Sequence, residues 1–305
     1  MKKNIVMCLL SAALVFSAFG NTLWAGQVVT DEAKAWARSA VEQEKSLGAP
    51  PSGKTVAVLY FHDTTASQKL APLQKGLAFM LMTDLAKVEG LQLVERVKLQ
   101  ALVEELGLGA SGVVDDSTAP RVGRLLQARW LVGGDLLQGQ TSELKVDSDV
   151  VGTQKMNVLG RPTAEGMLAQ LFDIEKKLLF QTIELLKVKV SPEKKNELQK
   201  PLSANPQALL YFFSGLDSSD RGDYLSAEDG YKRALVKDPG LAPARDALAE
   251  LYSLKLVSPK KRSRDLAHDL KDRTSSTDSL IPDDPERRYG DPGDNATTGQ
   301  IRVQW

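Results

Sequence analysis

The strongest constraint on the fold is the uninterrupted apolar run TVAVLYF at residues 55–61. A strand that is apolar at successive positions must be covered on both faces, which is typical of a parallel strand in a sheet flanked by helices. Helices and strands then alternate along the chain: a helix entered through Pro72 and ending near Lys87, a strand at 91–95, helices at 97–106 and 119–128, and strands at 130–137 and 144–151. This order predicts a mixed α/β or α+β sheet domain over residues 51–190.

Two more local features complete that domain. Residues 168–173 and 178–190 are predicted to pair as a β-hairpin across Glu175-Lys176-Lys177. The strand at 91–95 ends on Val94-Glu95-Arg96, and we expect Glu95 and Arg96 to form an ion pair at the sheet edge. The residues Leu99, Leu102, Val103 and Leu106 form one apolar helical stripe over the sheet.

The chain becomes wholly helical from Pro206. Its spacing of aromatic, small and proline residues fits the 34-residue tetratricopeptide pattern at Tyr211, Gly215, Ala227, Tyr231, Ala234 and Pro239. We expect one repeat and a following helix from Ala242 to Leu254; the alternative is an ordinary helical hairpin. Because a single repeat cannot bury its own faces, it must pack on the sheet domain or on a partner.

The N-terminus has the three-part layout of a secretory signal peptide. Lys2 and Lys3 precede an apolar run at residues 5–19, and small residues follow at cleavage positions. Cleavage is expected after Ala25, with Gly20 as the second choice and an uncleaved membrane anchor as the alternative. Cys8 is the only cysteine and lies too early in the run for lipidation, so the mature chain would hold no thiol.

A helix is predicted to follow the signal peptide. It begins at the capping residue Thr30, with Asp31 and Glu32 in its first turn, and ends at Gly48. From about Ser258 the sequence is polar, which is typical of a disordered tail. The predicted organisation is a signal peptide at 1–25, a helix and linker at 26–50, the sheet domain at 51–190, a tetratricopeptide-like helical domain at 191–257 and a disordered tail at 258–305.

Composition gives no indication of nucleic-acid binding. The 39 basic and 39 acidic residues balance, so neither a basic footprint nor an acidic one stands out. We therefore expect protein rather than nucleic-acid partners.

Several motifs resemble catalytic or cofactor sites but have the wrong context. GAPPSGKT at 48–55 matches the phosphate-loop expression, yet a helix precedes it and a strand follows, the reverse of the required order. GLGASG at 107–112 follows a helix, although a dinucleotide loop follows a strand. His62-Asp63 has no second histidine or cysteine nearby, and the acidic pairs near Asp115 and Asp147 lack a calcium-loop pattern. We predict no catalytic residue, cofactor or metal; a nucleotide hydrolase acting through Lys54 is the enzyme alternative.

Residues 56–137 resemble the CsgG/HfaB family of envelope proteins. The landmarks are the VAV strand at 56–58, LVERVKLQALVEE at 93–105 and GRLLQARWLVG at 123–133. The later FDIEKKLLF at 172–180 resembles the closing hairpin of the family. The resemblance covers about residues 54–190, and it implies a CsgG-like sheet domain with a role in secretion, surface-organelle assembly or outer-membrane biogenesis, without catalysis.

The family's channel-forming member has a long constriction loop and membrane-spanning hairpins. Here the corresponding loop is the short DTTASQKLAP at 63–72, and charged residues interrupt the alternation within 141–165. The resemblance thus favours a periplasmic accessory protein that binds an envelope protein or peptide, or assembles with copies of itself, with peripheral outer-membrane association. An export-channel subunit is the alternative. The expected partner contacts in the helical groove are Tyr211, Phe212, Tyr224 and Tyr252.

Overall fold

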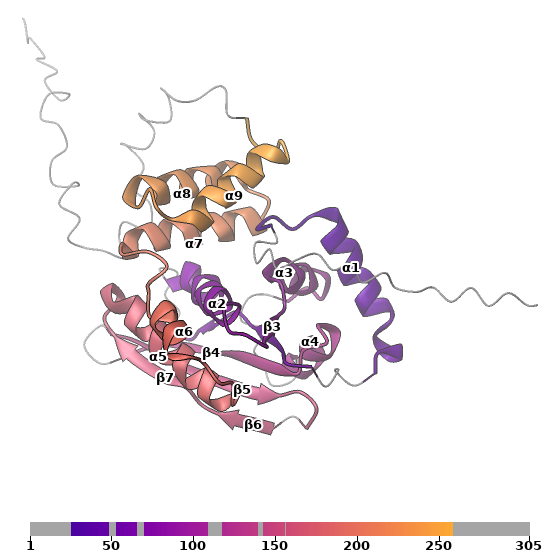
Figure 1. Cartoon of the computed structure of the whole chain (residues 1–305). Coiled ribbons are helices and arrows are strands. Elements are labelled where there is room, and N and C mark those ends of the chain that lie inside the picture. Colours follow the sequence, from indigo (N-terminus) through magenta and orange to yellow (C-terminus); the bar gives the residue numbers. More distant parts are fainter. Residues whose placement is uncertain are drawn as a thin grey trace, which may run out of the picture.

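A computed structural model describes residues 26–48, 53–65, 70–108, 118–139, 143–155 and 157–258 (Figure 1). The predicted signal peptide and most of the predicted tail lie outside these residues. The helices are α1 (Asp31–Glu42), α2 (Ala71–Leu85), α3 (Arg96–Glu105), α4 (Ala119–Leu125), α5 (Leu171–Leu185), α6 (Pro192–Leu198), α7 (Pro206–Asp220), α8 (Tyr224–Lys237) and α9 (Ala242–Ser253), with short 3-10 turns η1 (Glu44–Ser46) and η5 (Leu168–Gln170). The strands are β1 (Thr55–Val58), β2 (His62–Asp63), β3 (Gln92–Leu93), β4 (Trp130–Gln138), β5 (Leu144–Gly152), β6 (Asn157–Gly160) and β7 (Thr163–Gly166).

The strands form one mixed sheet in the order β3-β1-β4-β5-β6, in which β2 also pairs with β4 and β7 with β5. β1 runs parallel to β3 and β4, whereas β5 runs antiparallel to β4 and to both outer strands. From Val56 to Phe61 every side chain is buried, as a strand that is apolar at successive positions requires. The mixed α+β fold class predicted from the sequence is confirmed.

β5 has one face in the core and one toward solvent. Leu144, Val146 and Val150 are buried, while the intervening Lys145, Asp147 and Asp149 are partly exposed. The weak alternation in the sequence therefore belongs to a nine-residue strand. β6 and β7 pair with opposite ends of β5 and follow one another along it, and together they form one outer edge of the sheet.

The predicted hairpin over 168–190 is wrong, because this segment contains helix α5. The same correction applies to the expected closing hairpin at 172–180. The buried residues of α5 recur at intervals of three and four, namely Leu171, Ile174, Glu175, Leu178, Leu179, Thr182 and Ile183. The segment also contains no glycine, asparagine or proline that would favour a tight turn at Glu175-Lys176-Lys177.

The C-terminal region is helical, as predicted. α7 and α8 pack closely where Gly215 lies against Tyr231 and Gly230; a Cβ on Gly215 would lie 2.6 Å from the Tyr231 ring. Tyr231 is fully buried, in the place that the tetratricopeptide pattern assigns to a large aromatic residue. The assignment of these helices to a tetratricopeptide repeat remains a prediction.

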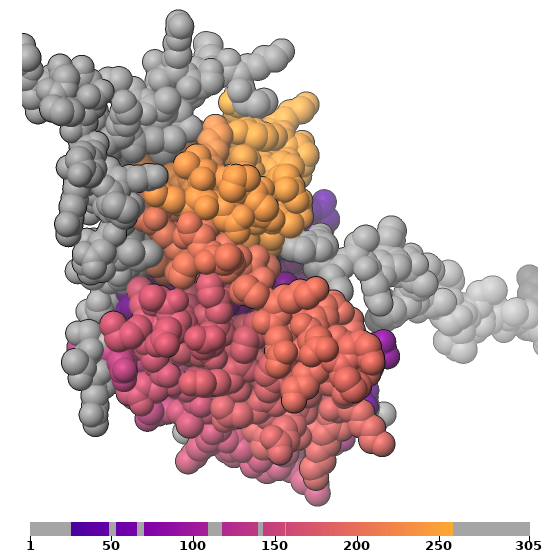
Figure 2. Space-filling view, turned by 60° about the vertical axis from the view of Figure 1, so that its left-hand side comes forward, coloured from indigo at the N-terminus to yellow at the C-terminus, as the bar shows by residue number. Residues whose placement is uncertain are grey.

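The helical segment buries its open face on the sheet domain. The rings of Phe79 in α2 and Phe212 in α7 meet edge to face at 5.0 Å, and the Phe213 ring occupies the space beside Gly76 that a Cβ would fill. Buried residues of both parts form one continuous hydrophobic core. In Figure 2 the red-orange region of α7 lies on the magenta sheet domain, and the orange helices lie above it.

Candidate partner-binding site

The four residues predicted to contact a partner differ in their exposure. Phe212 is buried against Phe79 of the sheet domain, and Tyr211 is buried with Arg233 of α8 over its ring, so in this structure neither presents a surface to a partner. The physical reason is that the repeat packs on its own chain rather than on another one. Tyr224 and Tyr252 are partly exposed, and the Tyr252 hydroxyl donates a 2.8 Å hydrogen bond to Glu228. Partner binding through these two residues remains a prediction.

The junction between sheet and helices contains a buried ionic network. Arg96 Nη1 lies 3.0 Å from both carboxylate oxygens of Asp220, at the end of α7, and Lys75 Nζ lies 2.8 Å from Asp220 Oδ2. The Asp220 and Arg96 side chains are only 1% and 5% exposed. The expected Glu95–Arg96 pair is therefore wrong, since Glu95 instead faces Lys98 at 3.5 Å and Arg96 points into the junction.

Burial and charge compete in this network. Burial acts against the charged guanidinium of Arg96, but Asp220 outweighs it and the Arg96 pKa is raised. Burial lowers the pKa of Lys75, although Asp220 opposes this change. Burial also raises the pKa of the Tyr60 hydroxyl, which donates to Gln100 at 2.8 Å. Because these groups are buried, we conclude that the network stabilises the contact between the sheet domain and the helical segment.

A second buried cluster joins α2 to α5. The Glu175 carboxylate is fully buried with Lys176 Nζ 3.0 Å from its Oε2, and Lys176 also pairs with Asp84. Neither Glu175 oxygen accepts a well-directed hydrogen bond from the described residues. Burial, together with the nearby Asp84 carboxylate, raises the pKa of Glu175 to about 8.

This raised pKa predicts a pH-dependent stability. Between the ordinary glutamate pKa and about 8, folded Glu175 keeps a proton that the unfolded chain has released, so stability falls as pH rises through that window. Glu175→Gln should remove a slope of up to about 1.4 kcal/mol per pH unit, measured by urea unfolding between pH 5.5 and 8. The exposed Glu193→Gln is the control and should keep the wild-type slope. Equal slopes in wild type and Glu175→Gln would contradict this assignment.

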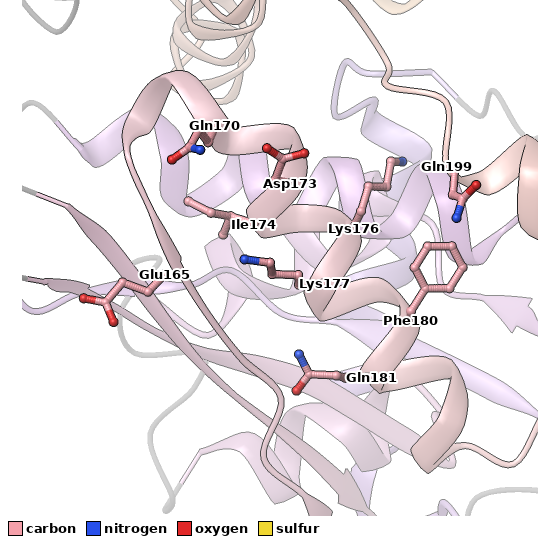
Figure 3. A pocket seen from close by; sticks show the side chains of 9 residues that line it. All are labelled: Glu165, Gln170, Asp173, Ile174, Lys176, Lys177, Phe180, Gln181 and Gln199. Carbon is pink, nitrogen blue, oxygen red and sulfur yellow. The ribbon is translucent and has the colours of Figure 1, made fainter.

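The candidate binding site is an open groove of about 620 Å³ between β7, α5 and the end of α6 (Figure 3). It is lined by Glu165, Gln170, Asp173, Ile174, Lys176, Lys177, Phe180, Gln181 and Gln199. Figure 3 shows Lys177 and Gln181 extending from α5 on the side of the strand that carries Glu165, while Phe180 faces Gln199. The Lys195 ammonium lies 5.7 Å from the Phe180 ring centre.

The groove borders the sheet edge. Gln181 uses its side-chain amide as a strand would, because it accepts from the Thr163 N–H at 3.2 Å and donates to the Thr163 carbonyl at 3.0 Å. Pro162, which precedes Thr163, has no backbone N–H that could donate to a neighbouring strand. These two features protect this part of the edge from pairing with another strand. The side chains of Glu165 and Met167 beside it are exposed, and the Met167 N–H donates to Gln170 at 3.0 Å.

The lining of the groove is suited to polypeptide. Three glutamine amides supply both donors and acceptors, Phe180 supplies an apolar surface, and lysines and carboxylates of both signs are present. The carboxylates of Glu165 and Asp173 disfavour a phosphate or nucleic-acid ligand. The sequence prediction missed this site because it treated α5 as a hairpin. The spacing of three and four among its apolar residues is the signal that would have found it.

The motif residues do not assemble into a further site in the described part of the chain. His62 Nδ1 lies 3.4 Å from Asp135 Oδ1, and both side chains are more than 40% exposed. Among the described residues, no three histidine, cysteine or acidic side chains converge to hold a metal. Much of the GAPPSGKT and GLGASG matches lies outside the described residues. The described helices include none that is long and apolar enough to cross a bilayer.

The fold thus defines a mixed α/β sheet domain to which a helical segment is attached. Residues 37–155 match the family model described as curli production assembly/transport component CsgG, which supports a CsgG-family domain in this part of the chain. The LpoB C-terminal domain from Salmonella enterica is similar at 13% identity and a TM-score of 0.31, covering 45% of this chain and 98% of that one. The same domain from Escherichia coli gives 13% identity and a TM-score of 0.30, covering 43% and 97%. No curated protein matches this chain.

Proposed function

We propose that this protein is a non-catalytic envelope protein that binds an extended peptide segment of a partner in the groove between β7 and α5. The CsgG-family match over 37–155 supports an envelope role in assembly or transport. The observation that carries the binding proposal is the amide-rich lining of the groove beside a sheet edge. The predicted signal peptide would deliver the protein to the periplasm, where peripheral contact with the outer membrane is compatible with this role.

The occupant follows from the chemistry of the groove. An extended peptide presents N–H and C=O groups at regular intervals, and the Gln199 amide can satisfy both kinds. Gln181 and Gln170 already bond to Thr163 and Met167, so they can offer only their remaining N–H and lone-pair positions. Lys177 is exposed and forms no ion pair with the described residues, so it is available to an acidic side chain. Phe180 gives an apolar contact for a neighbouring side chain. We therefore favour a segment with one acidic and one apolar residue close together.

Crosslinking in cells tests this proposal. A photo-crosslinking amino acid at Lys177 or Gln199 should capture one discrete partner, whereas the same amino acid at Val236 should capture none. Val236 is 73% exposed on α8, so it controls for simple accessibility. With the crosslinker at Gln199, Lys177→Glu should abolish the product. Products of equal strength from all three positions, or none from the groove, would contradict a binding role.

The same experiment separates partner binding from self-assembly. A crosslinked product with twice the mass of the chain would identify a second copy as the occupant. The export-channel alternative predicts ring-shaped oligomers that persist in detergent, and it does not require the groove. The capped edge at Thr163 disfavours assembly by strand pairing along this part of the sheet.

A further inference from the structure

The first described residues lie in the junction between the sheet domain and the helical segment. The N–H of Gln27 donates to Glu250 Oε2 at 2.5 Å, and the N–H of Val28 lies 3.3 Å from Oε1. From the other side, Arg96 donates to the Gln27 carbonyl and, at 3.0 Å, to its side-chain oxygen. In Figure 1 the indigo segment accordingly starts beside α7 and α9 before it turns into α1.

Gly26 is in direct contact with the same carboxylate. A Cβ on Gly26 would collide with Glu250 Oε1, so any larger residue here would have to displace the Glu250 carboxylate. The backbone nitrogen of Gly26 is bonded to the same Cα and therefore lies close to that oxygen.

The Glu250 carboxylate has no direct ion pair among the described residues, and the nearby charge is that of Arg96, which also bonds to Gln27. Burial raises the pKa of Glu250, and the N–H groups of Gln27 and Val28 together with the charge of Arg96 only partly offset this effect. Among the described residues, Glu250 forms no ion pair with a lysine or arginine. A cation placed at Gly26 would give Glu250 a direct ion-pair partner in addition to the Arg96 charge.

We propose that Glu250 is the binding site for the α-ammonium group of the mature chain. Hydrolysis of the Ala25–Gly26 peptide bond by a signal peptidase consumes one water and leaves a carboxylate on Ala25 and an ammonium group on Gly26. The new ammonium pairs with Glu250 and fastens the N-terminus to α9. Removal of the signal peptide thereby completes the junction that Arg96 and Asp220 begin. This inference is independent of what the groove binds.

Thermal unfolding of two forms of the mature chain tests the proposal. One form begins with a free amine at Gly26, and the other carries an acetyl group on that amine, which removes the charge. We expect the free form to melt about 2–4 °C higher, as a stabilisation near 1 kcal/mol gives for a chain of this size. N-terminal sequencing of the exported protein should also show Gly26 as the first residue.

Two variants provide the comparison. In Glu250→Gln the difference between free and acetylated forms should vanish, whereas in Asp246→Asn it should persist. Asp246 lies one turn earlier on α9 and is exposed. Asp246→Asn therefore removes one negative charge, as Glu250→Gln does, but from a side chain that does not contact Gly26. Equal melting temperatures of the two wild-type forms, a difference that survives in Glu250→Gln, or a different first residue would each overturn the proposal. If Glu250→Gln does not fold, the wild-type pair alone decides.

Discussion

Replacing Asp220 by asparagine is expected to lower the free energy of unfolding by about 3–5 kcal/mol, measured by urea denaturation. The change removes the negative charge that compensates Arg96 in a nearly dry junction and leaves Lys75 with Asp217, at 3.1 Å, as its remaining partner. A buried charge that loses its partner retains its desolvation penalty, which is why the loss is larger than that of a surface pair. We expect the helical segment to detach first, because Asp220 ends α7.

The matched control is Glu95→Gln. Glu95 is adjacent to Arg96 in the sequence, but it pairs with Lys98 on the surface. Surface ion pairs contribute roughly 0–1 kcal/mol, so this variant should be close to wild type. If the two variants lost the same stability, Arg96 would be held by its neighbour in the sequence, and the junction described here would be incorrect.

Truncating Phe212 to alanine is expected to have a similarly large effect, about 3–5 kcal/mol. The ring is fully buried and contacts Phe79 at 5.0 Å and both Phe213 and Tyr231 at 5.8 Å between centroids. Its removal leaves a cavity between α2 and the helical segment, in addition to the lost apolar burial. Urea unfolding of the whole chain measures the effect.

Leu225→Ala serves as the comparison, since Leu225 is 57% exposed on α8 and should change stability by no more than about 0.5 kcal/mol. A small effect of Phe212→Ala would mean that α7 does not pack on the sheet domain in solution. In that case Phe212 would again be available for a partner, as the sequence pattern suggested.

Local signals in the sequence were sufficient for the sheet core and for most helices. The run at 55–61 is buried as its composition requires, and the hydroxyl of Thr30 accepts the N–H of Ala33 as an N-cap should. The close packing of Gly215 against Tyr231 also follows from the spacing of small and aromatic residues. Each of these features depends on residues within one or two elements.

The missed features depend on contacts between distant parts of the chain. Arg96 meets Asp220 and Gln27 meets Glu250 across more than a hundred residues, and no local pattern encodes such pairs. The segment of α5 is predicted as a hairpin because short apolar runs fit both the strand period of two and the helical period of 3.6. The burial of the charged residue Glu175 on the core face of this helix does not follow from the sequence pattern. The groove depends on α5, so it was missed with it.

The binding account is tested most directly by the affinity of the purified protein for the peptide segment identified by crosslinking. The account predicts that Lys177→Glu weakens binding at least tenfold, while Val236→Glu, which adds the same negative charge at an exposed site on α8, leaves the dissociation constant unchanged. Equal affinity of wild type and Lys177→Glu would contradict the groove as the binding site.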